Sequence, residues 1–270
     1  MNARLVSLTI GTALTVATLG ATVRPAAAQT APAPKFGIAD NSFLVEEAFN
    51  QETGVFQNIF VMSRSRHGVW NGSFTQEWPA PGMRHQLSVT APLSVFNGSA
   101  AVGDGLINYR FQVSNGEGRM PAFSPRLSAV LPTSADRRAY GTSGVGWQVN
   151  LPASKQFGAL FVHANAGSTM MRDGKGSDWQ QTPFVAGSVI VALRPMFNLM
   201  FETYSESRPE LGGRERVTTY APGFRTGWNI GDKQWIIGIA VPITRGATHD
   251  TGVLGYLSYE LPFRSLSSKK

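Results

Sequence analysis

The sequence predicts an all-β fold: a transmembrane antiparallel β-barrel of about twelve strands, preceded by a linker and a short N-terminal periplasmic helix. Residues 252–263 alternate between an apolar face, which includes Val253, Leu257 and Phe263, and a mixed face that carries Glu260. Stretches of this kind recur along most of the chain, and the connections between them alternate between tight turns and looser polar loops. One alternating strand also fits a soluble antiparallel sheet, so the recurrence and the loop pattern decide for the barrel.

Composition narrows the class of protein. The 270 residues are 42% hydrophobic and only 15% charged, and the mean hydropathy is -0.09. That hydropathy excludes a helical membrane bundle, whereas a barrel dilutes its apolar residues with polar lumen residues. The chain has no cysteine, which excludes a disulfide scaffold and a Cys-ligated metal site. The net charge of +7 comes from scattered residues, so no nucleic-acid partner is predicted.

Residues 1–28 have the features of a cleaved secretory signal peptide. Arg4 precedes a long uncharged apolar run, and residues 26–28 are alanines suited to cleavage. An uncleaved anchor helix is the alternative, because the run approaches membrane-spanning length. The chain is therefore expected to act beyond the inner membrane, in the bacterial outer membrane.

Residues 29–52 are predicted to form a Pro/Ala linker and then a two-turn helix, which Asn41 or Ser42 would cap. A helix this short is marginal alone and needs a surface to pack on. The hypothesis is therefore a plug in or under the periplasmic mouth of the barrel, and the alternative is a tether without function. The candidate plug residues are Phe43, Leu44, Glu46, Glu47 and Phe49.

Residues 53–263 are predicted to form the barrel, and residues 264–270 a polar tail. Strands are expected near 53–63, 69–78, 83–92, 103–113, 122–131, 144–154, 157–170, 181–193, 196–206, 215–228, 234–243 and 251–263. Tight connections such as 79–82 and 194–195 alternate with looser ones such as 94–102 and 207–214, the arrangement of periplasmic turns and external loops. Outer-membrane barrels commonly end on an aromatic residue that the barrel-assembly machinery recognises, and Phe263 resembles that signal.

The polar faces of the predicted strands should line the lumen, because charged side chains are costly against outer-membrane lipid. Tryptophans near strand ends fit the aromatic belts of a membrane protein. The polar row either borders a water-filled path or pairs within itself and closes the barrel, and the sequence leaves both open. The lumen-lining candidates are Arg84, Gln86, Arg110, Gln112, Arg126, Gln148, Asn150, Asn198, Glu202, Arg225 and Glu260.

Catalytic chemistry has little support in the sequence. His163 and Asn165 share a strand face, with Ser168 nearby, which suggests an outer-membrane hydrolase, but a lumen-lining polar row explains these residues more simply. The glycine-containing turn at 173–178 lacks the ligand spacing of a calcium loop, and four scattered histidines form no zinc pattern. No catalytic residue, cofactor or metal is therefore predicted.

Several segments together resemble a known bacterial family of outer-membrane transporters, named for the MetA-pathway of phenol degradation. They are FLVEEAFNQETGVFQNIF, FTQEWPAPGMRHQLSVTAPL, GDGLINYRFQ, FSPRLSAVLPT and GWQVNLPASKQ, and the resemblance extends over most of 43–263. It implies an outer-membrane β-barrel, grouped with proteins of aromatic degradation and loosely with transporters of hydrophobic compounds. It implies a class of solute and no particular ligand.

The function expected from pattern and resemblance is passive uptake of small, aromatic or hydrophobic solutes across the outer membrane by a non-enzymatic channel. A structural or adhesion barrel with a plugged lumen is the first alternative. An outer-membrane hydrolase is the second.

Overall fold

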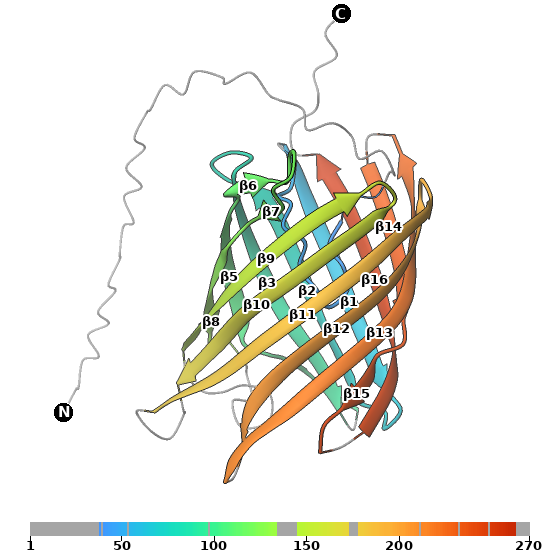
Figure 1. Ribbon diagram of the computed structural model, residues 1–270. Helices are drawn as coiled ribbons and strands as arrows, with labels where there is room; N and C mark the ends of the chain where they lie inside the picture. Colours follow the sequence, from blue (N-terminus) through green and yellow to red (C-terminus); the bar gives the residue numbers. More distant parts are fainter. Residues whose placement is uncertain are drawn as a thin grey trace, which may run out of the picture. The chain divides into compact units, whose positions relative to one another are not determined.

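The structure is a computed structural model and describes residues 38, 40–52, 54–96, 98–133, 145–172, 178–210, 212–231, 233–247 and 249–262 (Figure 1). The predicted signal peptide, residues 29–37 of the predicted linker, the terminal aromatic Phe263 and the polar tail lie outside the described residues. Those predictions stay predictions.

The described residues form one antiparallel sheet that closes on itself. The main strands pair in the order β1–β2–β3–β5–β8–β9–β10–β11–β12–β13–β14–β16, and β16 pairs back with β1. Four short strands continue or flank them: β4 pairs with β3, β6 with β7, β7 with β9, and β15 with both β13 and β16. The result is a closed barrel of 12 strands, which confirms the predicted fold class. The strands are β1 (Val55–Ser65), β2 (Trp70–Pro79), β3 (His85–Phe96), β4 (Ser99–Val102), β5 (Gly105–Phe111), β6 (Ser114–Asn115), β7 (Ala122–Phe123), β8 (Arg126–Leu131), β9 (Gly146–Phe157), β10 (Leu160–Arg172), β11 (Trp179–Arg194), β12 (Phe197–Glu210), β13 (Gly213–Ile230), β14 (Lys233–Ala240), β15 (Ile243–Arg245) and β16 (His249–Pro262).

Each strand presents an apolar outer face and a buried inner face, because successive side chains of a strand point to opposite sides. On β12, Leu199 and Phe201 are 45% and 50% exposed, whereas Met200 between them and Asn198 and Glu202 on either side are 4%, 2% and 0% exposed. The outer faces of the other long strands are likewise rich in exposed Val, Leu, Ile and aromatic residues. This arrangement is the reverse of a soluble barrel, whose apolar side chains turn inward.

The two ends of the barrel differ. We call the end at which β1 begins and β16 ends the base, and the opposite end the loop end; the base is uppermost in Figure 1. By their places on the strands, Trp78, Trp228 and Trp235 lie near the base, and Trp70 and Trp147 lie near the loop end. Aromatic residues at both ends are the pattern of interfacial belts.

Three sequence predictions about local structure are wrong. The loop predicted at 94–102 is mostly strand, because β3 and β4 pair as far as Phe96 and Ser99. No helix forms over 41–52, where the chain is irregular. The loop predicted at 207–214 is mostly strand: β12 and β13 pair as far as Glu210 and Gly213, and Gly212 makes the turn with a φ of 87°. This hairpin extends past the apolar part of the wall, so its polar sequence resembles a loop. Among the described residues, none belongs to a helix long and apolar enough to cross a membrane.

Candidate functional site

The lumen contains part of the chain itself. We call residues 38 and 40–52 the lumen segment. The segment accepts bonds from Arg110 on β5 and donates bonds to Glu202 on β12. These strands lie on opposite sides of the barrel, because several strands separate them in either direction around the sheet. A segment that bonds to opposite walls of a closed barrel lies inside it, as Figure 1 shows.

Side chains of the wall satisfy the backbone of the lumen segment. The amides of Phe43 and Leu44 both donate to Glu202 Oε2, at 3.1 and 3.2 Å. Farther along, backbone amides of the segment donate to Asn165 Oδ1, Ser154 Oγ and Gln86 Oε1, at 2.7–2.8 Å. A buried backbone amide needs a partner, and a helix supplies partners from within. Here the wall supplies them, which is the physical reason why the predicted helix does not form.

The segment enters and leaves this network near the base. Asp40 Oδ1 accepts from Gln57 Nε2, close to the start of β1. Ser42 Oγ lies 3.4 Å from Ser188 Oγ, nearer the middle of β11. Gln51 returns to the base, where its Nε2 donates to Glu260 Oε1 at 3.2 Å. The segment is therefore a loop that lies in the base half of the lumen.

Glu46 is the centre of one charged cluster. Its carboxylate lies 3.1 Å from Arg110 Nη1 and 2.7 Å from Arg126 Nε, and it accepts from Asn150 Nδ2 at 2.7 Å. Burial alone raises the pKa of Glu46, but Arg126 and Arg110 outweigh burial, so the pKa lies below its usual 4.5. Arg110 also donates to the backbone carbonyls of Glu47 and Phe49. Arg110 Nε also donates to Asn50 Oδ1 at 3.0 Å, so one buried guanidinium holds four residues of the segment.

A second cluster holds the other arm of the segment. Arg225 donates to the carbonyls of Asp40 and Asn41, at 2.7 and 2.9 Å, and its Nη2 lies 3.3 Å from Glu47 Oε1. Burial raises the pKa of Asp40 from 3.8 to about 7, although the Arg225 guanidinium lowers it. Asp40 is therefore a group of the segment that changes charge near neutral pH.

Phe43 anchors the segment in an apolar recess of the wall. Its ring is 7% exposed and lies 5.1 Å from the Tyr256 ring, centroid to centroid. It belongs to a buried apolar cluster with Ile236, Leu254 and other wall residues. The ring fits only because position 238 is glycine: a Cβ atom there would lie 2.6 Å from Phe43 Cε1.

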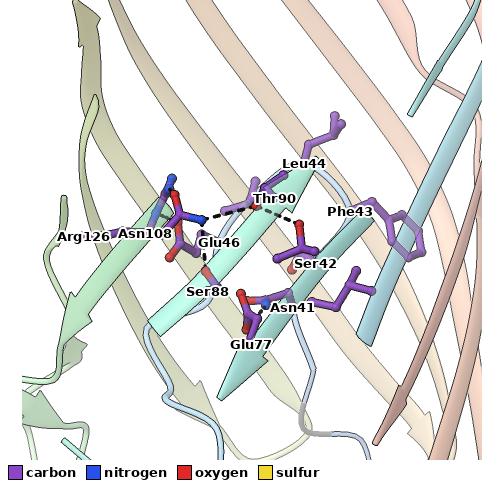
Figure 2. Close-up of a pocket in the computed structure, with 13 residues that line it drawn as sticks. Asn41, Ser42, Phe43, Leu44, Glu46, Glu77, Ser88, Thr90, Asn108 and Arg126 are labelled. Carbon is purple, nitrogen blue, oxygen red and sulfur yellow. Dashed lines mark hydrogen bonds and ion pairs between the residues drawn. The ribbon is translucent and has the colours of Figure 1, made fainter. Parts of the chain in front are cut away.

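A pocket of about 200 Å³ lies between the lumen segment and the wall of β1, β2, β3, β5 and β8 (Figure 2). Its polar lining includes Glu77, Asn108 and Arg126, and its apolar lining includes Phe43 and Ile59. Figure 2 shows Arg126 and Asn108 at one side of the pocket and Phe43 at the other. The pocket is large enough for a small organic molecule and amphipathic in its lining.

Most lumen-lining candidates from the sequence bond to the lumen segment in the structure. They are Gln86, Arg110, Gln112, Arg126, Asn150, Glu202, Arg225 and Glu260. Gln148 accepts from Arg126, and buried Asn198 lies opposite Arg225 in the sheet register. Arg84 is elsewhere: it is exposed in the turn before β3, with its guanidinium 5.0 Å from the centre of the Phe111 ring.

Of the candidate plug residues, all but Phe49 are at least partly buried. Phe43, Leu44, Glu46 and Glu47 contact the inner wall through the bonds above, whereas Phe49 is 38% exposed beside a second pocket at the base. Sequence reasoning missed several partners of the segment. Ser154 has the same inward parity as Gln148 and Asn150 on β9, so the alternation contained that signal. The sequence contained no signal for the wall residues Ser188 and Gly238, or for Asp40 within the segment itself.

The structure does not assemble the hydrolase site that the sequence suggested. His163 and Asn165 face inward, but Ser168 has the opposite parity on β10, whose register is continuous. A different set does come together: Ser154 Oγ lies 2.8 Å from His163 Nδ1, and His163 Nε2 lies 3.7 Å from Glu47 Oε1. Ser154 is 1% exposed and its Oγ accepts from the Ala48 amide, so these residues hold the segment and present no reachable nucleophile. Among the described residues, no group of three or more His, Asp and Glu side chains could hold a metal ion.

Comparison with solved structures identifies a similar fold. The chain resembles the COG4313 outer membrane channel from Pseudomonas putida F1, with 11% sequence identity and a TM-score of 0.58, over 83% of this chain and 98% of that one. Outer membrane protein opdK from Pseudomonas aeruginosa aligns at 11% identity over 77% of this chain and 97% of that one, with a TM-score of only 0.29. No protein-family model matches the chain, and no curated protein matches it in sequence.

Proposed function

We propose that this chain is an outer-membrane β-barrel channel whose lumen is closed by its own N-terminal segment. The observation that carries the proposal is the lumen segment itself, held by wall side chains and by no strand pairing. Removal of the segment leaves every backbone bond of the barrel intact. A solved outer membrane channel with the same fold supports the location and the role.

The solutes in this proposal are small and aromatic or hydrophobic, and they move passively into the cell. The resemblance to the transporter family of the MetA-pathway of phenol degradation supports that class, and so do the apolar side chains of Phe43 and Ile59 at the pocket. A cleaved signal peptide and recognition of the final strand by the barrel-assembly machinery belong to the same proposal.

The energetics of the segment suit a gate. A typical hydrogen bond contributes a net ~0.5–1.5 kcal/mol, because water replaces the partner when the bond breaks. The segment therefore leaves more readily than any strand, whose removal would expose an unpaired ladder within lipid.

A reversible crosslink tests the proposal. The Oγ atoms of Ser42 and Ser188 are 3.4 Å apart, so cysteines at both positions lie within reach of a disulfide. The chain has no other cysteine, so the pair S42C/S188C is unambiguous. In planar bilayers we expect the oxidised pair to be silent and its reduced form to conduct like the wild type. Each single-cysteine variant is the control for the two substitutions.

A closed structural or adhesion barrel is the second candidate, and the paired charges of Arg110, Glu46 and Arg126 favour it. In that case neither redox form of the crosslinked protein conducts, and wild-type liposomes swell no faster than empty ones for any small solute. Arg110→Ala and Glu202→Ala would then lower stability without changing permeability.

A further inference from the structure

One carboxylate of the pocket is only partly engaged. Glu77 is 8% exposed and lines the pocket from β2. Its Oε2 accepts from Gln86 Nε2 at 2.8 Å and from Asn41 Nδ2 at 3.4 Å. Among the described residues, nothing donates to Oε1, and none of their ion pairs includes Glu77. The pocket therefore contains a carboxylate oxygen with unused acceptor capacity.

The other polar groups of the pocket do not supply the missing donor, because they bond to one another. Asn108 Nδ2 donates to Ser88 Oγ and Thr90 Oγ1, and Thr75 Oγ1 lies 2.9 Å from Thr90 Oγ1. Arg126 is engaged as well: it donates to Glu46, Asn108, Ser128 and Gln148. Glu77 is 8% exposed, so a molecule that brings a donor into the pocket replaces water at an acceptor shielded from bulk solvent, where a hydrogen bond is electrostatically stronger.

The positive charges of Arg110 and Arg126 are already balanced by carboxylates of the protein. Two guanidinium groups, Arg110 and Arg126, are balanced by two carboxylates, Glu46 and Glu77, so an incoming carboxylate would add a negative charge that no cation of this cluster offsets. A molecule with an ammonium or hydroxyl head avoids that repulsion. Its apolar body would lie against Phe43 and Ile59, which also line the pocket.

We propose that this pocket binds a small aromatic or aliphatic solute by a head group that donates hydrogen bonds, an ammonium or a hydroxyl, and selects against carboxylates. This inference rests on the proposed function for its relevance to transport, and names the chemical class of the solute. Glu77 Oε1 accepts from the head group, and Phe43 and Ile59 contact the body.

The test measures binding of three probes with the same ring and different heads: benzylamine, benzyl alcohol and benzoate. The full-length barrel is reconstituted in lipid nanodiscs, and isothermal titration is corrected with empty nanodiscs. We expect benzylamine and benzyl alcohol to bind the wild type and benzoate to bind at least about tenfold more weakly. In Glu77→Gln, benzylamine affinity should fall by about tenfold or more, because an amide replaces the charged acceptor. Benzoate binding as tight as benzylamine binding would overturn the proposal.

Glu260→Gln is the matched control, since it makes the same change at a lumen carboxylate outside the pocket, bonded to Gln51. It should leave all three affinities unchanged, and an equal loss in both variants would contradict a role for Glu77. If Glu77→Gln does not give a folded, heat-modifiable band, the wild-type series decides by whether benzoate binds at least about tenfold more weakly than benzylamine. Binding is measured without transport, so an S42C/S188C protein that conducts in neither redox form but still selects benzylamine would refute the proposed function and leave this inference standing.

Discussion

Gly238→Ala isolates the anchor of the lumen segment. The added Cβ would lie 2.6 Å from Phe43 Cε1, so the ring must leave its recess. The position is on the inner wall of β14, and the alanine itself fits a strand. Phe43 is 7% exposed in the recess, and full burial of a phenylalanine side chain contributes about 1.5–3 kcal/mol. Loss of that contribution shifts the balance between the seated and the released segment by about 10- to 150-fold.

The assay is single-channel recording in planar bilayers, which reports the fraction of time that the lumen is open. Gly238→Ala should raise the ratio of open to closed time by a factor within this range. Gly255→Ala is the matched control, because a Cβ atom on that β16 glycine would have its nearest neighbour at 3.9 Å. Phe43→Ala should open the channel to a similar degree, and Gly238→Ala should add almost nothing in that background. Equal open fractions for Gly238→Ala and the wild type, or additive effects of the two changes, would refute the anchoring role of Phe43.

The remaining predictions concern charge and the unused serine. Arg110→Ala should weaken the seating of the segment by about 3–5 kcal/mol and raise the open fraction, because Glu46 and two carbonyls lose a buried donor. Arg110→Lys should restore the seating only in part, since an ammonium lacks the guanidinium fork. Asp40 has a raised pKa of about 7 in the seated segment. Its protonated form therefore stabilises the seated segment fully below about pH 4, and this stabilisation is lost as the pH rises through 7. The open fraction should therefore rise over that window in the wild type and rise less in Asp40→Asn, and equal slopes would contradict the assignment. The pH dependence from Glu46 runs the other way, because its pKa is lowered in the seated segment. Ionised Glu46 stabilises the seated segment above pH 4.5, and this stabilisation is lost as the pH falls. Glu46→Gln should therefore flatten the acid side of the plot of open fraction against pH. Ser168→Ala should leave any lipid hydrolysis by the preparation unchanged, and loss of such activity would revive the hydrolase interpretation.

The barrel could be predicted because its evidence is repeated in every strand. Pairs such as Phe201 and Glu202 differ in burial as strongly as the alternation of the sequence requires. One strand of this kind is weak evidence, but a dozen strands with alternating connections leave few other folds. Strand ends were less predictable, because the tip of the β12–β13 hairpin lies beyond the apolar part of the wall and has no apolar face to mark it.

The lumen segment could not be predicted in the same way, since its conformation is set by the wall. The helix expected over 41–52 rested on local capping and an apolar side. Glu202, Asn165 and Ser154 outcompete that local preference by supplying acceptors to the amides of Phe43, Glu46 and Ala48. These contacts join residues more than a hundred positions apart, and no local pattern encodes them. Gly238 illustrates the limit: its role is visible only when the Phe43 ring lies over it.

One feature of the sequence does anticipate a filled lumen. The predicted lumen row contains more arginines than glutamates, and a buried guanidinium needs a carboxylate or several carbonyls. Residues 38–52 contain Asp40, Glu46, Glu47 and Glu52 and no lysine or arginine. An acidic segment next to a barrel with excess inward arginines is complementary in charge, and the structure places Glu46 on Arg110 and Arg126 and Glu47 on Arg225. Inward arginines of an open pore would be free to meet anions from solution. Here the chain's own carboxylates and carbonyls engage them, so a solute that enters must either displace those groups or bind beside them at Glu77.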